Sequence, residues 1–226
     1  MKSFLKIRST SDGSTTVENT QLGETYHSVH GAVTESRHVF LLNGLEWFAT
    51  NRTERPIRIF EIGLGTGLNA ALAIQWSVQN KIPIQYSSIE KFPLEVDLID
   101  SLIFPGVDSQ WMEIIHRSVW NEEIRIQPEI TFTKISGDLL NFNAEPGTVD
   151  LIFFDAFAPA RQPEMWDISI IQKTASLIRG EGVLVSYCAQ GQFKRNLRSC
   201  GLDVASLPGP PGKREMVRAT RPPITA

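Results

Sequence analysis

The sequence predicts an α/β fold built on a mostly parallel sheet. Three observations lead to this prediction: short apolar runs recur along the chain, helical periodicity lies between several of them, and a glycine-rich turn follows the first run directly. Strands that alternate with helices favour a doubly wound sheet with right-handed crossovers. Several runs are continuously apolar, which is typical of buried parallel strands. The predicted strands are residues 57–62, 84–90, 130–135, 149–155, 183–188, 202–206 and 215–220.

An N-terminal extension is expected ahead of this sheet. The chain is predicted to divide near Pro56, into an extension of residues 1–55 and a domain of residues 56–226. Within the extension, two β-rich runs flank the pair Asp12-Gly13, a dipeptide typical of hairpin turns. The sequence therefore predicts a hairpin with strands in residues 3–9 and 14–20.

Helix boundaries are predicted from capping residues and glycines. A helix is expected from Thr34 towards Thr50, with Thr34 as its N-cap and Asn43-Gly44 as a candidate break. A second helical pattern precedes the fifth strand, and Gly180 is expected to be its C-cap.

Composition excludes several classes of protein. With 226 residues, 42% of them hydrophobic and 21% charged, the chain is long enough for a sizeable core and is neither disordered nor collagenous. Its two cysteines, Cys188 and Cys200, rule out a disulfide framework and favour a reducing compartment. No signal peptide is expected at Met1, and the uncharged stretch 62–80 is too polar to span a membrane. The expected location is the cytoplasm, and no metal site is expected because the histidines lack ligand spacing with Cys or carboxylates.

Charge is distributed unevenly along the chain. Between residues 190 and 226 there are seven basic residues and two acidic ones, although the whole chain has a net charge of −3. Lys213 and Arg214 follow a rigid loop, residues 208–212, which would present them at an edge. This pattern predicts a surface that faces a polyanion and phosphate contacts for these two residues, the alternative being ordinary solvated charges.

The glycine-rich turn predicts a nucleoside site. The first strand leads into Glu61-Ile62-Gly63-Leu64-Gly65-Thr66-Gly67, whose Gly-x-Gly-x-Gly spacing differs from the Gly-x-Gly-x-x-Gly of dinucleotide sites. Glu90 ends the second strand, where it can accept both ribose hydroxyls, and Asp138 follows the third, where it can accept from an adenine amino group. Acceptors at three successive strand ends resemble the S-adenosylmethionine site of class I methyltransferases. The alternative is a purely structural turn with exposed carboxylates.

A carboxylate follows the most apolar predicted strand. Residues 149–154 lead into Asp155, at the sheet edge where a methyl acceptor would lie beside the cofactor turn. The alternative is a helix-capping Asp with Phe157 and Trp166 in the core. Tyr26, Phe157 and Trp166 are also candidates to stack on a flipped-out base, although core packing is the more common role of such side chains.

The chain resembles the methyltransferase half of the bifunctional bacterial enzyme MnmC and its stand-alone counterparts, sometimes called MnmD. The matching segments are residues 35–41, 61–69, 155–166 and 213–216, of which the block at Asp155 is the most specific. The resemblance implies a Rossmann-like class I methyltransferase fold with a seven-stranded, mostly parallel sheet. It also implies methyl transfer from S-adenosylmethionine to the primary amine of 5-aminomethyl-(2-thio)uridine at the tRNA wobble position.

The same resemblance implies roles for individual residues. Asp155 corresponds to the family's functional Asp, and Glu61 and Asn69 join the three glycines among the cofactor-binding residues. Because the chain stops at Ala226, the oxidase half of the bifunctional enzyme is expected to be missing, and a separate enzyme is expected to supply the amine. His30 and Glu35 lie in or beside the matching N-terminal segment, but the sequence assigns them no task.

Chemistry favours Asp155 as an acceptor that orients the amine. An alkylammonium has a pKa of about 10 and a free carboxyl about 4, so an ordinary Asp is a poor base for it. A fixed carboxylate instead stabilises the positive charge that develops on nitrogen. Two alternatives stay open: methylation of a pyrimidine carbon with Cys188 as the nucleophile, and a non-catalytic tRNA-binding protein with a methyltransferase fold.

Overall fold

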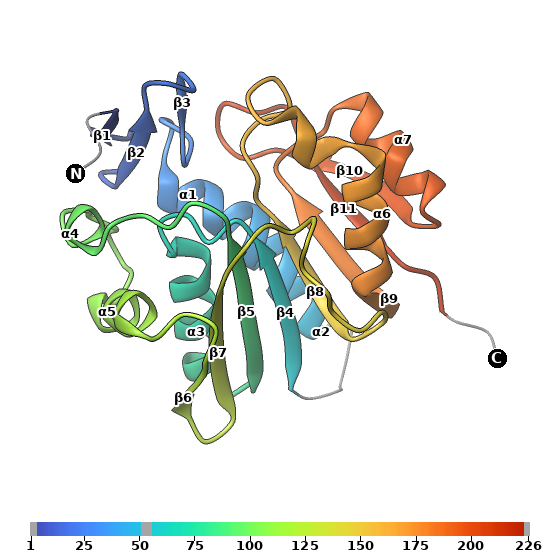
Figure 1. The fold of residues 1–226 in the computed structure, drawn as a ribbon, viewed down its shortest axis with the longest axis horizontal. Helices are drawn as coiled ribbons and strands as arrows, with labels where there is room; N and C mark the ends of the chain where they lie inside the picture. The colour runs from blue at the N-terminus through green and yellow to red at the C-terminus, as the bar shows by residue number, and fades with distance from the viewer. Residues whose placement is uncertain (1–3, 51–55, 224–226) are drawn as a thin grey trace.

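The computed structural model describes residues 4–50 and 56–223, which form an α/β fold with two sheets (Figure 1). Residue 3 of the first predicted strand lies outside the described residues, and so do residues 51–55 next to the predicted division at Pro56. The strands are β1 (Leu5–Ser9), β2 (Thr15–Asn19), β3 (Glu24–Thr25), β4 (Ile57–Ile62), β5 (Ile84–Glu90), β6 (Glu123–Gln127), β7 (Ile130–Ser136), β8 (Val149–Phe154), β9 (Ile178–Ser186), β10 (Asp203–Pro208) and β11 (Glu215–Thr220). The helical elements are α1 (Ala32–Ser36), η1 (Arg37–Glu46), α2 (Trp47–Thr50), α3 (Leu68–Asn80), α4 (Val96–Ile99), α5 (Ser109–Arg117), η2 (Pro163–Trp166), α6 (Ile168–Leu177) and α7 (Gly191–Ser199).

The large sheet has the order β10-β11-β9-β8-β4-β5-β7-β6. Pairing is parallel from β7 through β5, β4 and β8 to β9, whereas β6, β10 and β11 pair antiparallel with their neighbours. All seven predicted strands belong to this sheet, which confirms the fold class. The strand count is eight, however, because β6 forms a hairpin with β7 at one edge.

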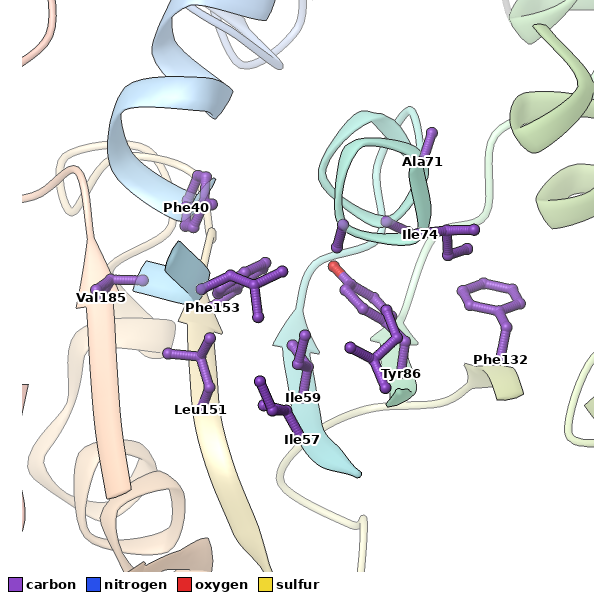
Figure 2. Close-up of a cluster of buried hydrophobic side chains, with 14 of the residues drawn as sticks. Phe40, Ile57, Ile59, Ala71, Ile74, Tyr86, Phe132, Leu151, Phe153 and Val185 are labelled. Carbon is purple, nitrogen blue, oxygen red and sulfur yellow. The ribbon is translucent and has the colours of Figure 1, made fainter. Parts of the chain in front are cut away.

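Helices cover both faces of the large sheet (Figure 1). On one face, Phe40 of η1 packs against Phe153 of β8 with ring centroids 5.1 Å apart, and α3 and α5 continue this layer (Figure 2). On the other face, α6 and α7 enclose a second core in which Phe193 contacts Phe154 and Trp166. The strands are therefore buried on both sides, as their apolar sequences predict. No helix within the described residues is long and apolar enough to cross a membrane.

The predicted hairpin is confirmed, and it caps the first helix. β1 and β2 pair antiparallel across a loop that contains Asp12. The Asp12 carboxylate accepts hydrogen bonds from the backbone N–H of Thr34, at 2.9 Å, and from its hydroxyl. The residue in the N-cap position is Gly31, where a Cβ would lie 2.6 Å from the Asp12 carboxylate. Thr34 as the N-cap was therefore wrong, because the cap is supplied by the hairpin.

The predicted break at Asn43-Gly44 is also wrong. The helix continues through both residues as the π-helical segment η1 and then as α2. A Cβ on Gly44 would lie 3.0 Å from Val185 and 3.2 Å from Phe153. This glycine therefore lets the helix approach the sheet closely and does not end it.

Gly180 lies inside a strand and is not a helix C-cap. Helix α6 ends at Leu177, and β9 begins directly at Ile178, which pairs with Val149 of β8. The pairing shifts register between this position and Val183, so the polar start of β9 is an irregular part of the strand.

Candidate active site

A cavity of about 610 Å³ opens at the carboxyl ends of the parallel strands. This volume is within the range of small-molecule sites, and the position is where open α/β sheets bind ligands. The N-terminal extension contributes to its wall, since the small sheet lies beside this edge (Figure 1). Among the described residues, its charged lining is Glu24, Glu35, Glu90, Glu95, Asp138, Asp155, Glu164, Lys91, Arg161 and Lys213. The excess of acidic groups favours a cationic ligand.

The glycine-rich turn is shaped by close contacts within the protein. Gly63 and Gly65 line the cavity with φ values of +93° and +51°, and a Cβ on Gly63 would lie 2.7 Å from the Asp155 carbonyl oxygen. Gly67 lies deeper, at the start of α3, where a Cβ would lie 2.6 Å from Nε2 of His116. The turn thus brings the ends of β4 and β8 together beside the cavity.

Glu90 holds the turn from the neighbouring strand. Its Oε2 accepts a hydrogen bond from the backbone N–H of Gly65 at 3.0 Å, and its Oε1 accepts from that of Phe92 at 2.8 Å. Each carboxylate oxygen has further lone pairs, so Glu90 can also accept from hydroxyl groups of a ligand in the cavity.

Asp138 lies in the same wall at the end of β7. It pairs with Lys91 at 2.7 Å and accepts from the backbone N–H of Leu140 at 3.0 Å. The hydrogen bond from Lys91 lowers the pKa of Asp138, so this side chain is an ionised acceptor. Acceptors at the ends of β5 and β7 fit the ribose hydroxyls and adenine amino group of S-adenosylmethionine.

Asn69 bridges two carboxyl groups at the base of the site. Its Nδ2 donates to Oδ2 of Asp155 at 2.8 Å and to Oε1 of Glu61 at 3.0 Å. Asp155 is partly exposed to the cavity, whereas Glu61 and Asn69 are buried behind it. Burial, with repulsion from Glu35, raises the pKa of Asp155 to about 7, and burial, with repulsion from Asp155, raises that of Glu61 to about 8.

Lys213 lies in the cavity wall and is paired. Its ammonium forms an ion pair with Glu35 and lies 3.7 Å from the centre of the Tyr187 ring. Glu35 is buried, and its other oxygen accepts from the backbone N–H of Ser28 at 2.8 Å. We refer to Asp155, Glu35, Lys213 and Tyr187 as the acceptor region.

Of the remaining candidate residues from the sequence, some line the cavity and others lie outside it. Tyr26 and Phe157 line the cavity and contact each other edge to face, with ring centroids 4.9 Å apart. Arg214 is exposed outside the cavity lining. Trp166 and Cys188 are buried in the core on the α6–α7 side of the sheet and do not line the cavity.

Two members of the acceptor region had no assigned role in the sequence. Tyr187 follows β9, so the rule that ligands bind at the carboxyl ends of strands could have identified it. Glu35 begins the matching segment 35–41, but that resemblance gave it no role, because its ion-pair partner is 178 positions away in the chain.

The strand order and the position of the cavity define a class I methyltransferase fold, and the acidic acceptors along β5 and β7 match its cofactor. Residues 107–222 match the family described as S-adenosyl-L-methionine-dependent methyltransferase. The chain belongs to this family, and S-adenosylmethionine is its cofactor.

Longer curated proteins contain a region similar to this chain. It is 30% identical over 207 residues to the tRNA 5-methylaminomethyl-2-thiouridine biosynthesis bifunctional protein MnmC of Methylobacillus flagellatus, covering 86% of this chain and 32% of that protein. The protein of the same name from Pseudomonas aeruginosa is 30% identical over 225 residues, covering 90% and 34%. The chain thus spans about a third of the length of these relatives.

A solved structure has the same architecture. The crystal structure of MNMC2 from Aquifex aeolicus superposes with a TM-score of 0.81 at 27% sequence identity, covering 98% of this chain and 73% of that chain. The similarity includes the N-terminal extension, since nearly the whole chain is covered.

Proposed function

We propose that this protein transfers a methyl group from S-adenosylmethionine to the primary amine of 5-aminomethyl-(2-thio)uridine at the wobble position of tRNA. The observation that carries the proposal is Asp155, a carboxylate at the end of β8 that shares one cavity with Glu90 and Asp138, the proposed acceptors for the cofactor. The names of the MnmC relatives support the tRNA substrate.

Asp155 would orient the amine and receive its proton. S-Adenosylmethionine supplies an electrophilic methyl group on a positively charged sulfur. Oδ2 of Asp155 is fixed by Asn69, which leaves Oδ1 to accept a hydrogen bond from the amine. The amine nitrogen would gain positive charge when it takes up the methyl group, and the nearby carboxylate would stabilise that charge.

The raised pKa of Asp155 makes it a better base than an ordinary carboxyl group. The methylated ammonium must lose a proton, and with a free carboxyl group this transfer is uphill by about 6 pKa units. At a pKa of about 7, the mismatch with an amine of pKa about 10 falls to about 3 units. Asp155 can therefore pass the proton on to water at moderate cost.

Tyr26 and Phe157 would hold the base. Their rings line the same cavity as Asp155 and are amphipathic or apolar surfaces of the kind that bind unstacked bases. The wobble nucleotide lies in a loop, so little pairing energy opposes its extrusion into a cavity.

Methylation of a pyrimidine carbon is less well supported. That reaction needs a thiolate that attacks the ring, whereas Cys188 is buried in the core and burial raises the pKa of its thiol. A non-catalytic role is opposed by the raised pKa of Asp155, a carboxyl group that lines the cavity.

The proposal extends to the reaction context. The substrate is a primary amine, so a separate enzyme would release it from its carboxymethylated form. Since tRNA modification takes place in the cytoplasm, that is the proposed location.

Incubation of the protein with S-adenosylmethionine and an anticodon stem-loop RNA that contains 5-aminomethyluridine tests the function. Nucleoside mass spectrometry should detect a gain of one methyl group on the aminomethyl nitrogen. An RNA with unmodified uridine is the control. Methylation of that control on carbon would contradict the proposal.

A further inference from the structure

The Glu35–Lys213 ion pair lies in the cavity wall, a position that a purely structural ion pair does not require. Both residues line the same cavity as Asp155, and they come from α1 and from the loop between β10 and β11. The side chain of Lys213 is 33% exposed and that of Glu35 only 8%. Lys213 is thus accessible from the cavity, while its partner carboxylate is buried behind it.

The loop that carries Lys213 is fixed by the N-terminal extension. Nε2 of His38 lies 2.8 Å from the carbonyl oxygen of Pro208. Gly212 has a φ of +84°, and the His30 ring occupies the position that a Cβ would take. These contacts hold the backbone that leads into Lys213, which limits the directions that its side chain can take.

The hydrogen-bonding capacity of Lys213 is only partly used. An ammonium has three N–H donors. One serves Glu35, and the face of Tyr187 attracts the positive charge without acting as a full hydrogen-bond acceptor. At least one donor therefore remains for a ligand in the cavity.

Charge balance selects the ligand group. The Glu35–Lys213 pair is neutral as a unit, so it offers little net attraction for a phosphate. A neutral carbonyl oxygen suits a single N–H donor, while Asp155, the remaining charge of the acceptor region, suits a cationic amine. A ligand that bears an amine and a carbonyl on adjacent positions satisfies both groups.

We propose that Lys213, positioned by Glu35 and Tyr187, donates a hydrogen bond to the ring carbonyl next to the reacting amine. The proposal rests on the proposed function, because in a 5-aminomethyluracil the 4-carbonyl is the neighbour of the aminomethyl group. The acceptor region then recognises amine and carbonyl together, with Lys213 as a substrate-binding residue and Glu35 as a positioning residue.

The test removes the carbonyl from the substrate and the ammonium from the protein. Two anticodon stem-loop RNAs are compared, one with 5-aminomethyluridine and one in which hydrogen replaces the 4-carbonyl oxygen. For the unchanged protein, kcat/KM should fall about 10- to 100-fold with the second RNA, as for loss of a hydrogen bond to a charged group. For Lys213→Met, kcat/KM should be low with both RNAs and differ less than about threefold between them.

Lys213→Arg is the conservative variant. It keeps the charge and the ion pair with Glu35, so it should recover part of the discrimination between the two RNAs. Glu35→Gln should lower kcat/KM for the carbonyl RNA while the Kd for S-adenosylmethionine, measured by calorimetry, stays within about twofold.

Three results would overturn the inference. One is equal rates of the unchanged protein on the two RNAs, which needs no variant and is independent of folding. Another is an equal loss on both RNAs in Lys213→Met, as expected of a structural clamp. The third is a reduced salt dependence of KM in Lys213→Met, which would indicate a phosphate contact. Failure of the proposed function is different: the unchanged protein would then bind S-adenosylmethionine but methylate neither RNA.

Discussion

Asp155→Asn should separate the charge of the acceptor region from its shape. The amide keeps the size and one acceptor oxygen of Asp155 but removes the negative charge. A unit charge about 4 Å from the developing ammonium contributes roughly 4 kcal/mol at an effective dielectric constant of about 20. Since the amide dipole replaces part of this, we expect kcat to fall by about 10²- to 10³-fold, the usual effect of losing one preorganised electrostatic group.

The pH dependence gives a second, independent signature. Burial and Glu35 raise the pKa of Asp155 to about 7, so the neutral form predominates below that pH and cannot accept a proton. Bound S-adenosylmethionine brings a positive charge that lowers this pKa, which puts the midpoint in the complex at or below about 7. The kcat/KM of the unchanged protein should rise through this midpoint, and Asp155→Asn should lose that rise while keeping the one due to the substrate amine.

Single-turnover methylation of the aminomethyluridine RNA at several pH values measures both effects. Cofactor affinity should change little, because Glu90 and Asp138, the proposed acceptors for the cofactor, are unaltered. Cys188→Ala is the matched control and should stay within a few-fold of the unchanged protein, since Cys188 lies outside the cavity lining. A dead Cys188→Ala together with an active Asp155→Asn would refute the amine mechanism.

Three further predictions concern the cofactor wall, the buried carboxyl group and the basic surface. Glu90→Ala should weaken S-adenosylmethionine binding by about 1–3 kcal/mol in calorimetry, because ribose hydroxyls lose their acceptor; unchanged affinity would move that contact elsewhere. Glu61→Gln should stabilise the protein: burial raises the pKa of Glu61 to about 8, so its unfavourable ionisation grows as pH rises from about 4.5 to 8. Urea unfolding should therefore show a gain at pH 9 and almost none at pH 4, and equal gains at both would exclude a titration effect. Arg214→Glu should raise the KM for tRNA and flatten its salt dependence, with Arg125→Gln on the exposed edge strand β6 as the control; an unchanged salt slope would make Arg214 an ordinary solvated charge.

Most of the large sheet could be predicted because its central strands are encoded locally. β4 and β8 are mainly apolar runs, interrupted by Arg58 and Glu61 in β4 and by Asp150 in β8, and such runs are typical of buried parallel strands. β6 was missed since it is an edge strand whose half-buried and exposed residues alternate, which gives no continuous apolar run. The polar start of β9 was missed for a related reason: it is a strand only because β8 pairs with it.

Helix ends were predicted less well because distant residues determine them. The cap of α1 comes from Asp12, which the hairpin brings to the helix from 22 residues away. A glycine such as Gly44 is typical of a helix break, but here the close packing of η1 against β8 and β9 explains why a glycine is present. Neither contact has a local signature in the sequence.

The site was predictable where it follows the parallel strands. Glu90, Asp138 and Asp155 all lie at carboxyl ends, where the topology gathers them in one cavity. The raised pKa of Asp155 could not be predicted, since it depends on burial and on repulsion from Glu35. The division of the chain into an extension and a domain stays a prediction.

The antiparallel strand β11 explains why a residue near the end of the chain belongs to the acceptor region. Parallel strands end at the cavity, so they deliver the residues that follow them, as β8 delivers Asp155. β11 pairs antiparallel with β9 and therefore begins at this edge. It consequently delivers the residues that precede it, and Lys213 comes two positions before Glu215, its first residue. The reversed strand thus lets a second chain segment line the same cavity as the carboxylate that the parallel strands supply.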